Sequence, residues 1–126
     1  MSESQIRKST IMFTDMVGYS RISSKDESNA LKLLGEHNNI LLPLINEHGG
    51  NVIKFIGDSI FAEFNNPTHA LNAAIKIQKK IRKRNKQSKH VDRFEIRIGL
   101  HMGKFVVKDD DLFGNDVNLG SRIEGI

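Results

Sequence analysis

The sequence predicts an α+β fold, a ferredoxin-like or palm-like layer in which helices pack on one face of an antiparallel-rich sheet. The expected element order is β-α-β-β-α-β-β-α, in which short hairpins alternate with helices that cross back over the sheet. In NVIKFIGDSIFAEF, residues 51–64, Gly57-Asp58 separates two apolar, β-prone runs, which is a hairpin signal. The length of 126 residues suits one domain.

Composition limits the class of protein. Hydrophobic residues make up 38% and charged residues 27%, as in soluble globular domains. Cysteine is absent, which excludes disulfides and thiolate chemistry and fits a cytoplasmic location. No apolar run is long enough to insert directly into a membrane, although tethering through segments outside this sequence stays open.

The net charge of +4 comes mainly from one run, KIQKKIRKRNKQSK at residues 76–89. We interpret this run as a solvated helix face and loop. A nucleic-acid patch is the alternative, but no aromatic residues alternate with the basic ones, so no nucleic-acid partner is expected.

The first strand is predicted at Ser9–Met16, after a polar tail or linker end at residues 1–8. Three consecutive apolar residues, Ile11 to Phe13, indicate a central strand that is buried on both faces. Gly18 then frees the backbone in a turn that leads to a helix. Residues 9–126 are taken as the folded domain.

The first helix is expected to open at a capping box, Ser24–Glu27, and to end at Gly49-Gly50. Pro43 should kink or divide it. Its mostly apolar face is predicted from 3.6-residue spacing to contain Leu31, Leu34, Asn38, Leu41 and Ile45.

A second helix is expected to start at Asn66-Pro67, as an N-cap followed by proline. Alternating apolar residues at 94–100 predict a strand, and Gly103 should turn the chain into a partner strand at 104–108. Gly114-Asn115 is expected to start a last helix. The apolar face of the second helix should contain Ala70, Leu71, Ala74, Ile77 and Ile81.

Two aspartates end neighbouring apolar runs. Asp15 ends the first apolar run and Asp58 lies in the hairpin turn, so both carboxylates meet at one sheet edge if these strands are adjacent. Carboxylates at one point repel unless a cation joins them, which indicates a magnesium site. Each residue alone is equally explained as a helix cap or a turn former.

Four motifs occur in order: FTDMVGYS, KFIGDSIFAEF, RIGLHMGK and DLFGNDVNLGSR. Together they resemble the catalytic domain of class III adenylate/guanylate cyclases from Ser9 to the last residue. The resemblance implies a signalling enzyme, a phosphorus-oxygen lyase that converts ATP to 3′,5′-cyclic AMP and pyrophosphate. The ribose 3′-hydroxyl would attack the α-phosphate with the help of two metal ions.

The same resemblance assigns metal and phosphate ligands. Asp15 and Asp58 match the metal-binding aspartates, which would hold two Mg²⁺ or Mn²⁺ ions per site, and the Met16 carbonyl is a further possible ligand. The family's triphosphate loop matches Val17, Gly18, Tyr19 and Ser20. Lys104 stands where many members have a phosphate-binding arginine; lysine keeps the charge but loses the bidentate fork.

Purine recognition is implied for Lys54 and Asp111. Lysine can donate to an adenine ring nitrogen and aspartate can accept from the exocyclic amine, so the pair favours ATP over GTP. A one-residue slip in alignment would select Asp110 instead. Guanylate cyclases typically have Glu and Cys at these positions.

Asn118 and Arg122 match the family's transition-state pair, in which Asn orients the ribose and Arg neutralises the α-phosphate. The family works as a homodimer with shared active sites, in which Lys54, Asp111, Asn118 and Arg122 complete the site of the other subunit. The family's domain continues beyond residue 126, so we expect the chain to be incomplete at its C-terminus and doubt that this segment alone is active.

Two other functions stay open. One is a non-catalytic cyclase-homology module that binds nucleotide or mediates dimerisation, and intact metal positions argue against it. The other is a cyclase of different specificity, a guanylate cyclase or a diguanylate cyclase on a related palm-like fold. The hairpin reads GDSIF rather than GG[DE]EF, which argues against a diguanylate cyclase.

Overall fold

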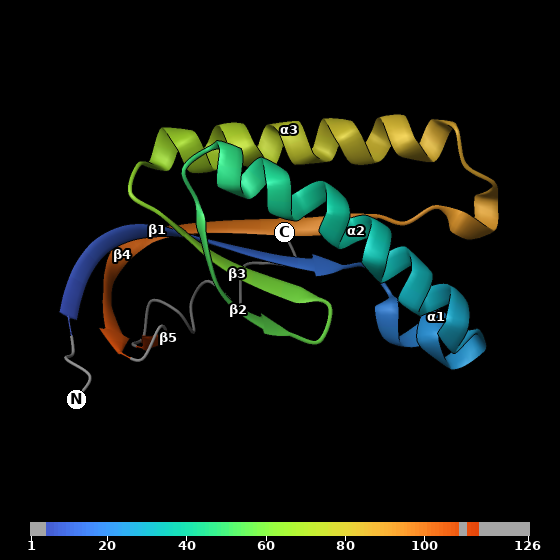
Figure 1. Cartoon of the computed structure of the whole chain (residues 1–126), viewed down its shortest axis with the longest axis horizontal. Coiled ribbons are helices and arrows are strands. Elements are labelled where there is room, and N and C mark those ends of the chain that lie inside the picture. Colours follow the sequence, from blue (N-terminus) through green and yellow to red (C-terminus); the bar gives the residue numbers. More distant parts are fainter. Residues whose placement is uncertain (1–4, 109–110, 114–126) are drawn as a thin grey trace.

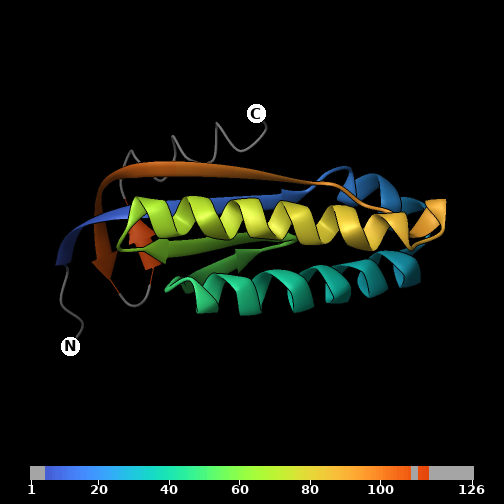
Figure 2. The same cartoon turned by 90° about the horizontal axis from the view of Figure 1, so that it is seen from above.

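A computed structural model describes the backbone of residues 5–108 and 111–113 and the side chains of residues 8–104. Within these residues a five-stranded sheet has the order β2-β3-β1-β4-β5, and every neighbouring pair is antiparallel. The α2 and α3 helices lie side by side over one face of the sheet (Figures 1 and 2). The elements are β1 (Gln5–Met16), α1 (Tyr19–Lys25), α2 (Glu27–Glu47), β2 (Asn51–Ile56), β3 (Ser59–Phe64), α3 (Pro67–Lys86), a 3₁₀ turn (His90–Asp92), β4 (Ile96–Lys108) and β5 (Asp111–Phe113).

The α+β prediction with helices on one face is therefore confirmed. Side chains alternate along β1, so Met12 and Met16 pack in the core beneath the helices. Ile11 and Phe13 point to the opposite face, where the Phe13 ring meets the Phe61 ring edge to face at 4.1 Å between centroids. β1 is thus buried on both faces, as its apolar run predicted.

The N-terminal boundary differs from the prediction. β1 begins at Gln5 rather than Ser9, because residues 5–8 continue the antiparallel pairing with residues 104–107 of β4. The expected polar tail at residues 1–8 is therefore wrong for residues 5–8. Polar side chains do not prevent strand formation where the neighbouring strand supplies the hydrogen bonds.

The first helical region is divided earlier than expected. A short α1 precedes α2, and Asp26, not Ser24, caps α2 by accepting a 3.0 Å hydrogen bond from the Asn29 amide. Pro43 lies inside α2 without dividing it. The positive φ of 80° at Gly49, just after α2, fits the predicted glycine C-cap.

The buried face of α2 is shifted from the predicted one. Leu31 is 58% exposed, whereas His37 is fully buried. Tertiary packing, rather than the spacing of the leucines alone, decides which positions of α2 face the core. The residues buried on α2 are Ala30, Leu33, His37, Leu41, Leu44 and Ile45.

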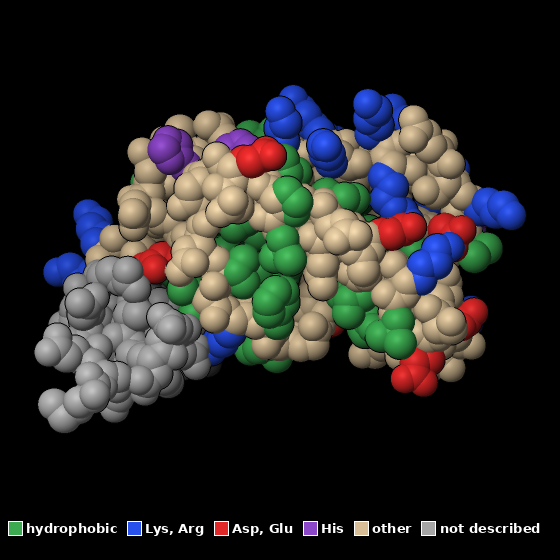
Figure 3. Space-filling view, in the orientation of Figure 1, with side chains coloured by type: hydrophobic (Ala, Val, Ile, Leu, Met, Phe, Trp, Pro, Cys, Tyr) green, Lys and Arg blue, Asp and Glu red, His purple; other side chains and the backbone are tan. Residues whose placement is uncertain are grey.

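The predicted start of α3 is confirmed, because the Asn66 side chain accepts from the Thr68 amide at 2.8 Å and Pro67 occupies the first turn. Leu71 was wrongly placed in the core; it is 51% exposed and Ala73 is buried instead. Lys and Arg side chains gather along α3 at the surface (Figure 3). No helix in the described part of the chain combines the length and apolarity that a membrane crossing requires.

The predicted turn at Gly103 is wrong. β4 continues through Gly103, which pairs with Ser9, and residues 104–108 belong to the same strand. The partner strand is β5, which pairs Lys108 with Asp111. A glycine inside a strand is tolerated where both neighbours in the ladder are paired, so glycine alone does not mark a turn. The predicted last helix at Gly114-Asn115 lies outside the described residues.

Candidate active site

The hairpin turn places Asp58 beside the end of β1. Gly57 adopts a φ of 58°, a left-handed conformation that lets two residues reverse the chain between β2 and β3. The Asp58 carboxylate accepts a 2.7 Å hydrogen bond from the Met16 backbone amide. This bond joins residues 42 positions apart in the sequence and fixes the turn against the last residue of β1.

Asp15 precedes Met16 and is almost fully buried. Its carboxylate is bound by the guanidinium of Arg97 on β4, with Nε to Oδ1 and Nη2 to Oδ2 both at 3.0 Å. The two residues are direct partners in the β1–β4 ladder. Sequence analysis did not identify Arg97. The alternation along this strand predicts that Arg97 points to the other face of the sheet from Ile96 and Ile98. Nothing in the local sequence shows which residue it meets on the neighbouring strand.

Asp15 and Asp58 thus lie at the same end of the sheet, while a joint site for their carboxylates stays a prediction. The Asp58 carboxylate contacts the amide of Met16, the residue after Asp15, and the Asp15 carboxylate is bound by Arg97. Oxygen donors of this kind suit Mg²⁺, which typically takes one or two carboxylates and completes its shell with water and phosphate. In the described residues no group of three or more acidic, His or Cys side chains could form a metal cage by itself.

The expected phosphate loop lies directly after these residues. The Val17 amide donates to the Glu95 carbonyl at 2.8 Å, which ties the loop to the chain just before β4. Gly18 has a φ of 69° and forms the N-cap of α1, and Tyr19 and Ser20 are its first residues. A Cβ at Gly18 would meet only the mobile end of the Arg21 side chain, so this turn depends on glycine for its dihedral rather than for space.

A β-bulge turns Lys54 to the face of the sheet that carries Phe13 and Phe61. Strict alternation from Val52, which packs against the helix-side core, would place Lys54 on the helix side as well. The register shifts between Val52 and Lys54, so Lys54 pairs with Phe61 and its ammonium lies 5.1 Å from the Phe61 ring centroid. The bulge was not foreseen, since nothing in the local sequence marks it.

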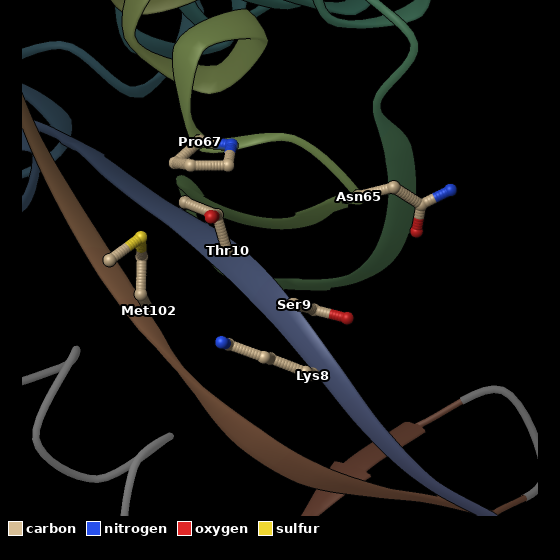
Figure 4. A pocket seen from close by; sticks show the side chains of 6 residues that line it. All are labelled: Lys8, Ser9, Thr10, Asn65, Pro67 and Met102. Atoms are coloured by element: carbon tan, nitrogen blue, oxygen red, sulfur yellow. The ribbon is translucent and has the colours of Figure 1, made fainter.

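Lys104 lies at the other end of the β1–β4 ladder, exposed and opposite Lys8. Asp15 is seven residues further along β1, roughly 23 Å at strand spacing. A pocket of about 440 Å³ lies at this end. Figure 4 shows the side chains that line it, which are Lys8, Ser9, Thr10, Asn65, Pro67 and Met102. The pocket is thus separate from the two aspartates, and the Ser9 hydroxyl is already committed to the buried Glu63 carboxylate at 2.5 Å.

Of the three remaining predicted residues, the structure describes only one, and that one by its backbone alone. Asp111 is the first residue of β5, and only its backbone is described. Asn118 and Arg122 lie outside the described residues.

The model of the adenylate and guanylate cyclase catalytic domain family matches residues 1–126. The chain belongs to this family. The putative adenylate cyclase 3 of Rhizobium meliloti (strain 1021) is 33% identical over all of this chain and 22% of its own length. A solved adenylate/guanylate cyclase/hydrolase from Silicibacter pomeroyi is 31% identical with a TM-score of 0.89, covering 98% of this chain and 72% of that one.

Similarity to known cyclases does not show whether the substrate is ATP or GTP. The guanylyl cyclase Cya2 has a structure with a TM-score of 0.85 to this cyclase domain, at 26% identity over 97% of this chain and 71% of that one. The cyclase domain spans less than a third of the length of the first curated relatives that it matches. Substrate and activity therefore need an argument from the site itself.

Proposed function

We propose that this cyclase domain converts ATP to 3′,5′-cyclic AMP and pyrophosphate. In this reaction the bond from the ribose O3′ to the α-phosphorus forms, the bond from the α-phosphorus to the bridging oxygen breaks, and the hydroxyl proton passes to solvent. The observation that carries the proposal is the hydrogen bond from the Met16 amide to the Asp58 carboxylate, which fastens the hairpin turn to the residue that follows Asp15.

Asp15 and Asp58 would hold two Mg²⁺ or Mn²⁺ ions, with the Met16 carbonyl as a further ligand. Bound divalent ions would supply charge neutralisation at the phosphates and acidify the 3′-hydroxyl. The donor set supports this assignment, because two carboxylates with no third acidic or imidazole ligand in the described residues suit a cation that is shared with phosphate and water.

The loop Val17 to Ser20 would bind the triphosphate, with backbone amides from Gly18 onward as donors, because the Val17 amide is taken by the Glu95 carbonyl. The left-handed conformation of Gly18, directly after the Asp15 strand, supports this role. Lys104 is a weaker candidate for a phosphate ligand than this loop. It lies on β4 far from Arg97, the residue that pairs with Asp15.

Lys54 and Asp111 would recognise adenine, and Asn118 and Arg122 would orient the ribose and neutralise the α-phosphate. In a homodimer each subunit would supply these four residues to the partner's metals. Support comes from Lys54, whose bulge turns it to the sheet face that carries Phe13 and Phe61. That face is opposite the helices, so a second copy of the sheet can approach it.

The test is product analysis with the full-length protein, Mn²⁺ and either ATP or GTP. Cyclic AMP should exceed cyclic GMP, and Asp58→Asn should lower turnover by about 100-fold or more, since losing only an outer-shell partner of a metal ligand typically costs roughly 10- to 100-fold. Glu47→Gln, an exposed charge change at the end of α2, should retain wild-type activity. Equal turnover in wild type and Asp58→Asn would overturn the site assignment.

One observation favours a second candidate, a non-catalytic module. The Asp15 carboxylate is already neutralised by Arg97, as in a domain that has no use for a metal. Such a module would bind nucleotide in the same assay buffer without forming a cyclic product from ATP or GTP. A cyclic GMP product would instead identify a guanylate cyclase.

A further inference from the structure

The two carboxylates of the candidate site are neutralised in different ways. Asp58 accepts from an uncharged donor, the Met16 amide, and this bond can persist when one of its oxygens binds a cation. Asp15 is held by a full positive charge, and both of its oxygens are taken by the Arg97 fork at 3.0 Å. Planar two-point pairing of this kind is the strongest that arginine offers to a carboxylate.

The sheet register sets this pair. Asp15 and Arg97 are opposite each other in the β1–β4 ladder, so their side chains leave the same face of the sheet. This is the face of Phe13, which pairs with Gly99 two residues along. Arg97 is therefore brought to the carboxylate by the same strand pairing that builds the site.

Burial is unequal within the pair. The Asp15 side chain is 12% exposed, whereas the Arg97 side chain is 42% exposed. The carboxylate is fixed by the strand end, while the guanidinium reaches it from the solvent side. When the contact opens, Arg97 is the partner that has room to move.

We propose that Arg97 is a positioning residue that holds Asp15 in the metal-free protein and gives way when a divalent cation binds. A cation shared by Asp15 and Asp58 needs at least one Asp15 oxygen, so it competes with a guanidinium that occupies both. This inference rests on the proposed metal site and concerns its affinity, not the chemistry of the reaction.

The test measures Mn²⁺ affinity without nucleotide, from the free Mn²⁺ signal in electron paramagnetic resonance of the full-length protein. Arg97→Gln should bind Mn²⁺ roughly tenfold more tightly than wild type, the factor expected from one lost charge-assisted contact. Arg97→Lys keeps the charge without the fork and should fall between the two. Arg82→Gln, the same charge change on the exposed face of α3, should match wild type within about twofold.

A melting experiment keeps the test valid if Arg97→Gln is less stable. In metal-free buffer the variant should melt below wild type, because the Asp15 carboxylate loses its countercharge, and saturating Mn²⁺ should narrow the difference. Equal Mn²⁺ affinity in wild type, Arg97→Gln and Arg97→Lys would overturn the inference alone. If wild type and Asp58→Asn both fail to bind Mn²⁺, the metal site itself is wrong and the inference falls with it.

Discussion

The Asp58 carboxylate accepts a 2.7 Å hydrogen bond from the Met16 amide, so the hairpin turn is fastened to the end of the central strand. Asp58→Asn keeps an acceptor of the same shape and removes only the charge. We therefore expect a stability loss of about 1 kcal/mol together with loss of Mn²⁺ binding. Asp58→Ala should cost more stability, because the Met16 amide then lacks its partner. Urea unfolding of both variants, with and without Mn²⁺, separates the two contributions; equal costs would refute the role of this bond.

Gly50 and Gly35 form a matched pair of substitutions. A Cβ at Gly50 would lie 2.6 Å from the Phe64 ring and 2.7 Å from Ile45, both in the core, so Gly50→Ala should destabilise the protein by about 1–3 kcal/mol. A Cβ at Gly35 in α2 would meet nothing within 4 Å, so Gly35→Ala should stabilise it by about 0.5–1 kcal/mol. Equilibrium unfolding measures both, and the same sign for the two variants would contradict this packing.

Arg84 connects three parts of the helical layer. Its guanidinium is paired with Glu36 on α2, donates to the Asp92 carbonyl at 2.8 Å and lies 4.5 Å from the Phe94 ring centroid. Arg84→Ala should cost about 2–3 kcal/mol, because a charged donor and a ring contact are lost together. Lys83→Ala, one residue earlier and exposed, should stay within about 0.5 kcal/mol in the same thermal unfolding experiment. Similar losses would mean that only helix propensity is being measured.

His37 should make stability depend on pH. Burial lowers the pKa of His37 below its ordinary value of 6.5, against smaller raising effects from the Asn38 hydrogen bond and the Asp58 charge. The unfolded chain thus binds a proton before the folded protein does, so stability is fully present above pH 6.5 and falls as the pH drops toward the folded-state pKa.

The variant His37→Leu removes this titration. As the pH is lowered from 8 to about 5, the unfolding free energy of wild type should therefore fall relative to that of His37→Leu. The same measurements on His90→Gln, which removes a histidine at an exposed position, serve as the control. A difference that stays constant with pH would show that His37 is not the group responsible.

The elements that the sequence predicted well are those fixed by local chemistry. The turn at Gly57 and the cap at Asn66 each depend on one backbone conformation or one side-chain acceptor within three residues. The errors arose where tertiary pairing decides. Gly103 was taken as a turn because glycine is common in turns, but its pairing with Ser9 keeps it in β4.

The candidate site divides in the same way. Asp15 and Asp58 were found from motifs and strand ends. Arg97 is 82 residues from Asp15, and only the β1–β4 register brings the two together. The bulge that turns Lys54 onto Phe61 was also invisible, since it depends on how β2 pairs with β3 rather than on the residues around Lys54.

The most direct test of the account is a mixing experiment with Asp58→Ala and Asn118→Ala in a Mn²⁺–ATP cyclase assay. Each variant alone should be inactive, since each homodimer would lack one required group at both of its sites. Mixing the two should restore part of the activity, because a mixed dimer holds one site with all its groups intact. Wild-type rates in either single variant, or no recovery on mixing two folded variants, would contradict a metal-dependent site shared between subunits.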